Sequence, residues 1–360
     1  QISQWQNTYA QLYSAYTGNQ ANTLEIVERA EPNYAPIGPN TTMNIALAAA
    51  IGALLAVGAI LLLEYLDDTV KSGEEIAALT GGAFLGIVPR IRSGMDIADS
   101  LITLHEPRSG FAECMRVLRT NLQFSSLDRP LRTILVTSPQ PSEGKSTTAA
   151  NLAVVMAQAG RRVVLVDTDL RRPVLHRMFG APNTWGFTSI LMGNGQDAGA
   201  NLSTANPENL LFVPSGPLPP NPSEILSSQR MESFLAHMQQ LVDVIIFDSP
   251  PLLTVSDSAI LATKVDGVVL VADYGSTRRE ALQKAVESLR QVGANLLGTV
   301  LNRVSTRSDG YYYYYYSRYY TDEEGRRKTV RRKRRRQTTE TNPTTKRPCL
   351  LYTSPSPRDS

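Results

Sequence analysis

Ten residues near the middle of the chain carry the kinds of side chain that hold phosphate groups. The segment Ser138–Thr147 reads SPQPSEGKST and follows an apolar run at Thr133–Thr137. The phosphates of a nucleotide need backbone N–H groups at a helix N-terminus, a Lys amine, and a hydroxyl that binds Mg²⁺. The segment supplies these in order through Gly144, Lys145, Ser146 and Thr147. We therefore predict a P-loop, although Pro139 stands where the first Gly of such loops usually lies.

Two further apolar runs end in a carboxylate. Val163–Asp167 is followed closely by Asp169, and Val244–Asp248 precedes a Pro-Pro pair. Ligands of open α/β sheets bind outside the carboxyl ends of the strands, and an Asp placed there holds Mg²⁺ directly or through water. An Asp that only caps the next helix is the alternative. Two such carboxylates beside a P-loop favour the metal site.

The elements that position these residues alternate between strand-like and helix-like patterns over residues 131–304. Helices are predicted at Ser146–Ala159, Ser223–Gln240 and Arg278–Val292. Continuously apolar strands that alternate with helices are typical of a parallel sheet covered on both faces. The fold class is therefore α/β, with a mostly parallel sheet between helices. The predicted strands are Thr133–Thr137, Val163–Asp167, Leu210–Val213, Val244–Asp248, Val268–Ala272 and Gly298–Asn302.

Upstream, residues 43–63 form 21 consecutive positions without a charge. As a helix they span about 31 Å, the thickness of a bilayer's hydrocarbon core, so we predict one transmembrane helix. The preceding residues 1–42 contain a helical pattern at Ile2–Tyr16 and a short alternating run at Leu24–Glu28. Because the chain starts at Gln1, we interpret this part as the truncated end of an extracytoplasmic domain.

The last part of the chain has an unusual composition. Residues 305–324 contain eight tyrosines, and residues 325–360 hold 12 Lys and Arg against 2 acidic residues. The preceding 324 residues hold 24 Lys and Arg against 31 acidic residues, so the folded body is acidic and nucleic acid is not an expected partner. The final residues, from about 337, are treated as possibly non-native. The tyrosines are Tyr311, Tyr312, Tyr313, Tyr314, Tyr315, Tyr316, Tyr319 and Tyr320.

These features together resemble the bacterial tyrosine autokinases of capsule and exopolysaccharide biosynthesis, fused to the end of a polysaccharide co-polymerase, or chain-length determinant, domain. Each motif is weak alone, but their order along the chain is specific. The resemblance covers most of the chain. It rests on the apolar span, the P-loop, the Tyr run, Glu64–Val70, Glu113–Arg119, Asp167–Pro173, Asn221–Glu224 and Asp248–Pro251.

The resemblance implies a role for each matching residue. ATP and Mg²⁺ would be bound, with Lys145 on the transferring phosphate and Ser146 as a metal ligand. Asp167 would position the metal and accept the tyrosine proton, with support from Asp169, while Asp248 would hold a metal-bound water. Asn302 would face the adenine. The tyrosines of residues 305–324 would be the phosphate acceptors.

The resemblance also implies partners and a location. Glu113, Arg116 and Arg119 share roughly one helix face and would join copies of the chain into a ring, whereas a plain solvated face is the alternative. The kinase domain would be cytoplasmic beneath the bacterial inner membrane, with residues 1–42 outside and residues 64–130 as a juxtamembrane connector. The expected partners are the polysaccharide polymerisation and export machinery and a protein-tyrosine phosphatase.

Two other functions remain open at this point. A MinD/ParA-type ATPase shares the fold and transfers phosphate only to water, but such proteins usually carry a second Lys where Gln140 stands. A non-catalytic scaffold that sets polysaccharide length is the other alternative. The intact phosphate-binding and acidic residues argue against it.

Overall fold

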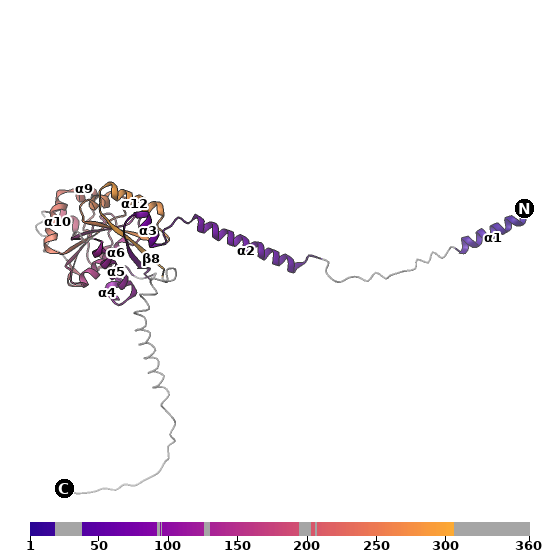
Figure 1. The fold of residues 1–360 in the computed structure, drawn as a ribbon, viewed down its shortest axis with the longest axis horizontal. Coiled ribbons are helices and arrows are strands. Elements are labelled where there is room, and N and C mark those ends of the chain that lie inside the picture. The colour runs from indigo at the N-terminus through magenta and orange to yellow at the C-terminus, as the bar shows by residue number, and fades with distance from the viewer. Residues whose placement is uncertain are drawn as a thin grey trace, which may run out of the picture. The chain divides into compact units, whose positions relative to one another are not determined.

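A computed structural model gives the fold of the chain and describes residues 1–18, 38–91, 94, 96–125, 130–193, 203–205 and 207–305. The chain divides into two compact units, Gln1–Asp67 and Asp68–Ser360 (Figure 1). The predicted strand at Leu24–Glu28, the tyrosine run and the basic run lie outside the described residues.

The described residues of the smaller unit form the helices α1 (Ile2–Gly18) and α2 (Thr41–Leu66). The helix α2 has 26 residues, a mean hydropathy of 2.7 over its apolar window, and no buried side chain. It is therefore long and apolar enough to cross a bilayer, which agrees with the prediction for residues 43–63. It ends where Asp67 adopts an extended conformation, at φ −78° and ψ 103°.

The described part of the larger unit is built on one sheet of eight strands in the order β1-β8-β7-β2-β6-β3-β5-β4. All neighbouring strands are parallel except β4, which runs antiparallel to β5. Six strands coincide with the predicted runs, so the prediction of a mostly parallel sheet is confirmed. The strands are β1 (Phe84–Pro89), β2 (Thr133–Thr137), β3 (Val163–Asp167), β4 (Ser203–Ala205), β5 (Leu210–Val213), β6 (Val244–Asp248), β7 (Gly267–Asp273) and β8 (Leu296–Val304).

The strand β1 lies inside residues 64–130, which the sequence predicts to be a connector. It pairs in parallel with β8 and forms one edge of the sheet. Residues 68–130 are therefore part of the unit that contains the sheet, which begins at Asp68. The apolar pattern is short and is interrupted by Gly86, a residue that weakens a strand, and this explains why the sequence alone does not reveal β1.

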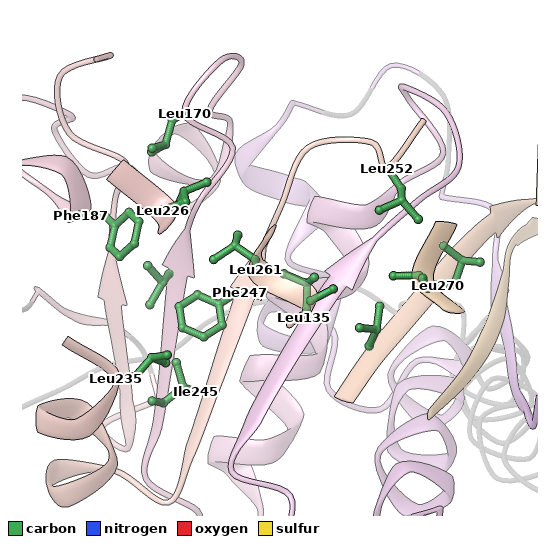
Figure 2. Close-up of a cluster of buried hydrophobic side chains, with 14 of the residues drawn as sticks. Leu135, Leu170, Phe187, Leu226, Leu235, Ile245, Phe247, Leu252, Leu261 and Leu270 are labelled. Carbon is green, nitrogen blue, oxygen red and sulfur yellow. The ribbon is translucent and has the colours of Figure 1, made fainter. Parts of the chain in front are cut away.

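Helices cover both faces of the sheet (Figure 1). Alternate residues of a strand point to opposite faces, so Leu135 of β2 joins one apolar cluster and Ile134 joins the other. Figure 2 shows the first cluster, in which Phe247 of β6 lies close to Leu135 and Leu261. This cluster includes side chains of α3 and of α8 to α12, whereas the second includes those of α4 to α7.

The predicted helices are confirmed with one correction. The segment Ser223–Gln240 forms two helices, because Ser228 is extended, at φ −69° and ψ 156°, and separates them. The helices of the larger unit are α3 (Gly73–Thr80), α4 (Ile102–His105), α5 (Gly110–Phe124), α6 (Lys145–Gln158), α7 (Leu175–Met178), α8 (Phe187–Met192), α9 (Pro222–Ser227), α10 (Gln229–Leu241), α11 (Asp257–Ala262) and α12 (Arg279–Gln291), with a 3-10 turn η1 (Ala98–Ser100).

Candidate active site

The predicted P-loop connects the end of β2 to the start of α6. Gly144 immediately precedes the helix with a positive φ of +89°, which glycine adopts without strain. A Cβ atom at this position would collide with the side-chain amide of Asn302. Ser142 also has a positive φ, +67°, which is unusual for a residue with a side chain. Because this backbone conformation is unfavourable by itself, contacts with residues outside the loop must stabilise it.

The amine of Lys145 lies among the predicted carboxylates. Its Nζ atom donates a hydrogen bond to Asp169 Oδ2 at 2.9 Å and is 3.7 Å from Asp248 Oδ1. It also lies 3.2 Å from Ser146 Oγ. Burial lowers the pKa of Lys145, but the charges of Asp248 and Asp169 more than offset this, so the net pKa is raised. The amine therefore remains charged, as a phosphate-binding group must.

The two carboxylates that follow β3 are held by backbone N–H groups. Asp167 Oδ1 accepts from the N–H of Asp169 at 3.2 Å, and its Oδ2 accepts from Leu175 at 3.1 Å. Asp169 Oδ1 accepts from the N–H of Arg172 at 2.9 Å. Complete burial, followed by the nearby charge of Asp248, raises the pKa of Asp167 well above its usual range. A carboxylate with a raised pKa is better suited to accept a proton.

Asp248 ends β6 and is paired in register with Asp167. Its side chain is fully buried, and neither carboxylate oxygen accepts a hydrogen bond from the residues that the structure describes. Burial raises its pKa to about 6, although the charge of Lys145 acts in the opposite direction. Buried polar atoms are rarely left without a partner. A carboxylate of this kind beside the Ser146 hydroxyl fits Mg²⁺, which prefers oxygen ligands and retains several waters.

Glu143 and Thr277, to which the sequence analysis assigns no role, form hydrogen bonds that support the P-loop. Glu143 Oε2 accepts from the N–H of Gln140 at 2.7 Å, and its Oε1 accepts from the hydroxyl of Thr277 at 2.5 Å. Burial is the main cause that raises the pKa of Glu143 to about 7. Asn302 Nδ2 donates to the carbonyl oxygen of Glu143 at 2.8 Å. No sequence signal identifies Thr277, because it lies 134 residues from Glu143.

A second missed group lies beside the acidic motif. Arg171 donates from Nε to Asp257 Oδ2 at 2.8 Å and from Nη2 to Oδ1 at 3.3 Å. Ser223 donates its hydroxyl to the same Oδ1 atom at 2.5 Å. Asp257 is fully buried, whereas 43% of the Arg171 side chain is exposed. The contact joins two of the sequence motifs, around Asp167 and around Asn221, which are about fifty residues apart.

The structure thus brings Lys145, Ser146, Asp167, Asp169 and Asp248 together. Thr147 is half-buried in the first turn of α6. Asn302 lies against the P-loop itself, at Glu143 and Gly144. The eight predicted acceptor tyrosines lie outside the described residues.

On the α5 face that is predicted to join copies of the chain, the arginines form bonds within the chain that the sequence does not reveal. Arg116 Nη1 pairs with Glu113 Oε2 of the same helix at 2.8 Å, and Arg119 Nη1 donates to the carbonyl oxygen of Val155 at 3.1 Å. Arg119 therefore ties α5 to α6 instead of pointing freely from the shared face. The i, i+3 spacing predicts which side chains are neighbours, but not which internal acceptor one of them reaches.

This sheet and this loop define the class of the protein, which is a P-loop nucleotide-binding protein. Residues 134–319 match the family model of the CobQ/CobB/MinD/ParA nucleotide binding domain. The chain is 43% identical over 213 residues to the tyrosine-protein kinase YwqD of Bacillus subtilis, a match that covers 59% of this chain and 90% of the relative.

Two solved structures agree with that relationship. The kinase domain of the Escherichia coli tyrosine kinase ETK superposes with a TM-score of 0.61 at 28% identity, and the match covers 67% of this chain and 97% of the domain. The chimerical protein CapA2B2 superposes with a TM-score of 0.60 at 34% identity, covering 65% and 100% of the two chains. The chain therefore belongs to the bacterial tyrosine-protein kinases.

Proposed function

We propose that the protein is an ATP-dependent tyrosine autokinase that phosphorylates the tyrosine run of residues 311–320 in a neighbouring copy. The observation that carries the proposal is that both buried carboxylate oxygens of Asp248 lack a hydrogen-bond partner among the described residues, while Oδ1 lies 3.7 Å from the amine of Lys145. A nucleotide with Mg²⁺ supplies the partners that these oxygens lack. Membership of the tyrosine-protein kinases supports tyrosine as the acceptor.

The residues of the site have distinct tasks in this reaction. Lys145 binds the γ-phosphate of ATP, and Ser146, Asp167 and Asp248 hold Mg²⁺, which when bound neutralises charge on the phosphate oxygens. Asp169 holds the Lys145 amine in place through its 2.9 Å hydrogen bond. Gly144 and Thr147 bring backbone N–H groups toward the phosphates. Asn302 fixes the loop and lies on the adenine side of the nucleotide.

The transfer step needs only positioning and one proton acceptor. The phenol oxygen of the acceptor tyrosine attacks the γ-phosphorus, the bond from phosphorus to the β,γ-bridging oxygen breaks, and ADP leaves. The phenolic proton passes to Asp167, whose raised pKa favours this acceptance. Each product phosphotyrosine adds about −1.5 to −2 charges to the tail.

Labelling with ATP tests the proposal directly. The full chain is incubated with radiolabelled ATP and Mg²⁺, and the labelled positions are mapped by mass spectrometry. We expect label on Tyr311–Tyr320 in the wild type and none in Lys145→Met. Hydrolysis of ATP without any protein label would instead support a MinD/ParA-type ATPase, and the absence of both activities would support a scaffold.

A ring of copies would let the tail of one copy reach the site of the next. The residues proposed for that contact are Glu113, Arg116 and Arg119 on α5. Arg116 is one-third exposed; its guanidinium pairs with Glu113 of the same helix and donates to the carbonyl oxygen of Pro107, and a neighbour's carboxylate would replace these contacts. We expect Arg116→Ala to shift the sedimentation of the full chain toward monomer and to lower tail labelling, and an unchanged oligomer would contradict this role.

The location follows from the same reasoning. The candidate membrane helix α2 directly precedes the kinase unit, and ATP requires that unit to be cytoplasmic. Residues 1–42 are then extracytoplasmic, as the end of a co-polymerase domain in the bacterial inner membrane. Regulation of capsule or exopolysaccharide polymerisation and export, reversed by a protein-tyrosine phosphatase, is the role that fits this arrangement.

A further inference from the structure

The exposed end of the active site carries a pair of arginines that the phosphoryl-transfer step does not use. Arg171 and Arg172 lie two and three residues after Asp169, and both are exposed. Their N–H groups lie at 3.4 Å and 2.9 Å from Asp169 Oδ1, the carboxyl group that also holds the Lys145 amine. The backbone of both arginines therefore lies next to the Asp169 carboxylate.

Arg171 is held in place by a buried carboxylate. Its guanidinium forms a two-point contact with Asp257, a fully buried carboxylate that begins α11. Ser223 shares that carboxylate, and Ser258 anchors the same helix to the carbonyl oxygen of Pro250. Arg171 thus connects the loop after β3, which carries Asp169, to the start of α11. Pre-orientation of this kind reduces the entropy lost when a ligand binds.

Arg172 provides a second positive charge. Within the part of the chain that the structure describes, its side chain makes no hydrogen bond or ion pair. The remaining nitrogen of Arg171, Nη1, likewise has no partner there. These two residues present positive charge at the exposed rim of a site whose interior is lined by Asp167, Asp169 and Asp248.

The acceptor segment has the complementary charge. Residues 309–324 contain four acidic residues and one Arg around the tyrosines. The acids are Asp309, Asp322, Glu323 and Glu324. We infer that Arg171, positioned by Asp257 and Ser223, and Arg172 together bind the acidic residues that flank the tyrosines and so select the segment that enters the site. This inference rests on the proposed autophosphorylation.

The test compares two synthetic acceptor peptides of residues 309–324 with the full chain as the enzyme. One peptide has the natural sequence, and in the other the four acids are replaced by Asn and Gln. We expect the wild type to label the natural peptide with a kcat/KM about three- to tenfold higher, through a lower KM, which is the range of a few exposed charge pairs. In Arg171→Gln and in Arg172→Gln the preference for the natural peptide should fall, because one of the two positive charges is gone.

Matched variants separate recognition from general damage. Arg162→Gln removes another exposed, carboxylate-paired arginine, at the opposite end of the sheet, and should keep the full preference for the acidic peptide. Ser223→Ala should weaken the preference less than Arg171→Gln, because Asp257 keeps its contact with Arg171. Arg172→Glu should prefer a peptide in which Asp322, Glu323 and Glu324 are Lys.

The affinity for Mg·ATP, measured by nucleotide fluorescence, should be the same in the wild type, Arg171→Gln and Arg172→Gln. A loss of ATP affinity in either variant would assign the arginines to the nucleotide and overturn the inference. An unchanged preference for the acidic peptide in both variants would also overturn it. If the wild type labels neither peptide and not its own tail, the proposed autokinase function has failed, and the inference fails with it.

Discussion

Two carboxylates at opposite ends of β6 show how one strand serves both structure and chemistry. Asp243, just before the strand, accepts hydrogen bonds from the backbone and the guanidinium of Arg162, with Arg162 Nη2 at 2.8 Å. Asp248, five residues later, is buried without a hydrogen-bond partner among the described residues. The hydrogen bonds with Arg162 lower the pKa of Asp243, whereas burial raises that of Asp248 to about 6.

This difference separates a carboxylate that stabilises the fold from one that is kept for a ligand. A paired carboxylate has its hydrogen-bonding needs met by the chain. An unpaired one lowers the stability of the free protein and is retained where binding supplies the missing partner. Substitutions at the two positions should therefore have opposite consequences for stability and activity.

The largest effect is expected for Asp248→Asn. Tail labelling should fall roughly a hundredfold or more, because a lost metal-binding carboxylate removes several kcal/mol of transition-state stabilisation. The melting temperature of the nucleotide-free chain should change little, because removal of a buried charge without a hydrogen-bond partner among the described residues offsets the loss of its attraction to Lys145, 3.7 Å away. A large loss of stability would show that Asp248 is structural after all, and unchanged labelling would remove it from the metal site.

The next effect concerns the support of the P-loop. Glu143→Ala removes the acceptors for Gln140 N–H and the Thr277 hydroxyl, so the Kd for Mg·ATP should rise about tenfold. Glu143→Gln should bind nearly as the wild type does, because its oxygen can accept from Gln140 while its amide donates to Thr277. Calorimetric titration gives both values. Equal affinities for the Ala and Gln variants would contradict a positioning role.

The pH dependence of stability should distinguish the two kinds of carboxylate. Asp248, with a pKa raised from 3.8 to about 6, and Glu143, raised from 4.5 to about 7, bind more protons in the folded state than in the unfolded state across those windows. Their contributions to the unfolding free energy therefore decrease as the pH rises from about 4 to 7. Asp243 has the opposite sign, because its contribution is present above pH 3.8 and is lost at lower pH.

Urea denaturation of the metal-free chain in detergent, from pH 4 to 8, tests the sign for the two carboxyl groups with a raised pKa. The profile of Glu143→Gln should be flatter than that of the wild type between about pH 4.5 and 7, because the titrating group is gone. A profile parallel to that of the wild type would show that Glu143 does not titrate in this range.

The smallest effect is expected for Asp243→Asn. It removes an exposed ion pair with Arg162, and such pairs contribute little to stability and less at high salt. Tail labelling should stay within twofold of the wild type, roughly the scatter expected for a surface substitution. The melting temperature should fall slightly, and the difference should shrink in concentrated salt. A marked loss of labelling would mean that the two ends of β6 are coupled.

Much of the candidate active site could be predicted from the sequence, because its residues stand at the ends of recognisable strands or at the start of a recognisable helix. Lys145 and Ser146 begin a helix after an apolar strand, and Asp167 and Asp248 end two other strands. In a parallel sheet these positions must converge. The residues that the sequence missed, Thr277 and Asp257, follow no local pattern and reach their partners only through the fold. The break at Ser228, which divides the predicted helix Ser223–Gln240 in two, was missed for a similar reason, because one extended residue does not change the helical periodicity of its neighbours.

The sequence by itself determined the alternation of strands and helices, the phosphate-binding loop, the apolar helix and the order of the acidic strand ends, since each depends on neighbours along the chain. The tertiary structure decided that residues 84–89 complete the sheet, that Arg119 bonds to α6, and that Asp257 holds Arg171. It also decided that, among the described residues, Asp248 has no hydrogen-bond partner while Asp243 accepts from Arg162. Burial and pairing depend on which distant groups surround a side chain, and only the folded chain fixes them.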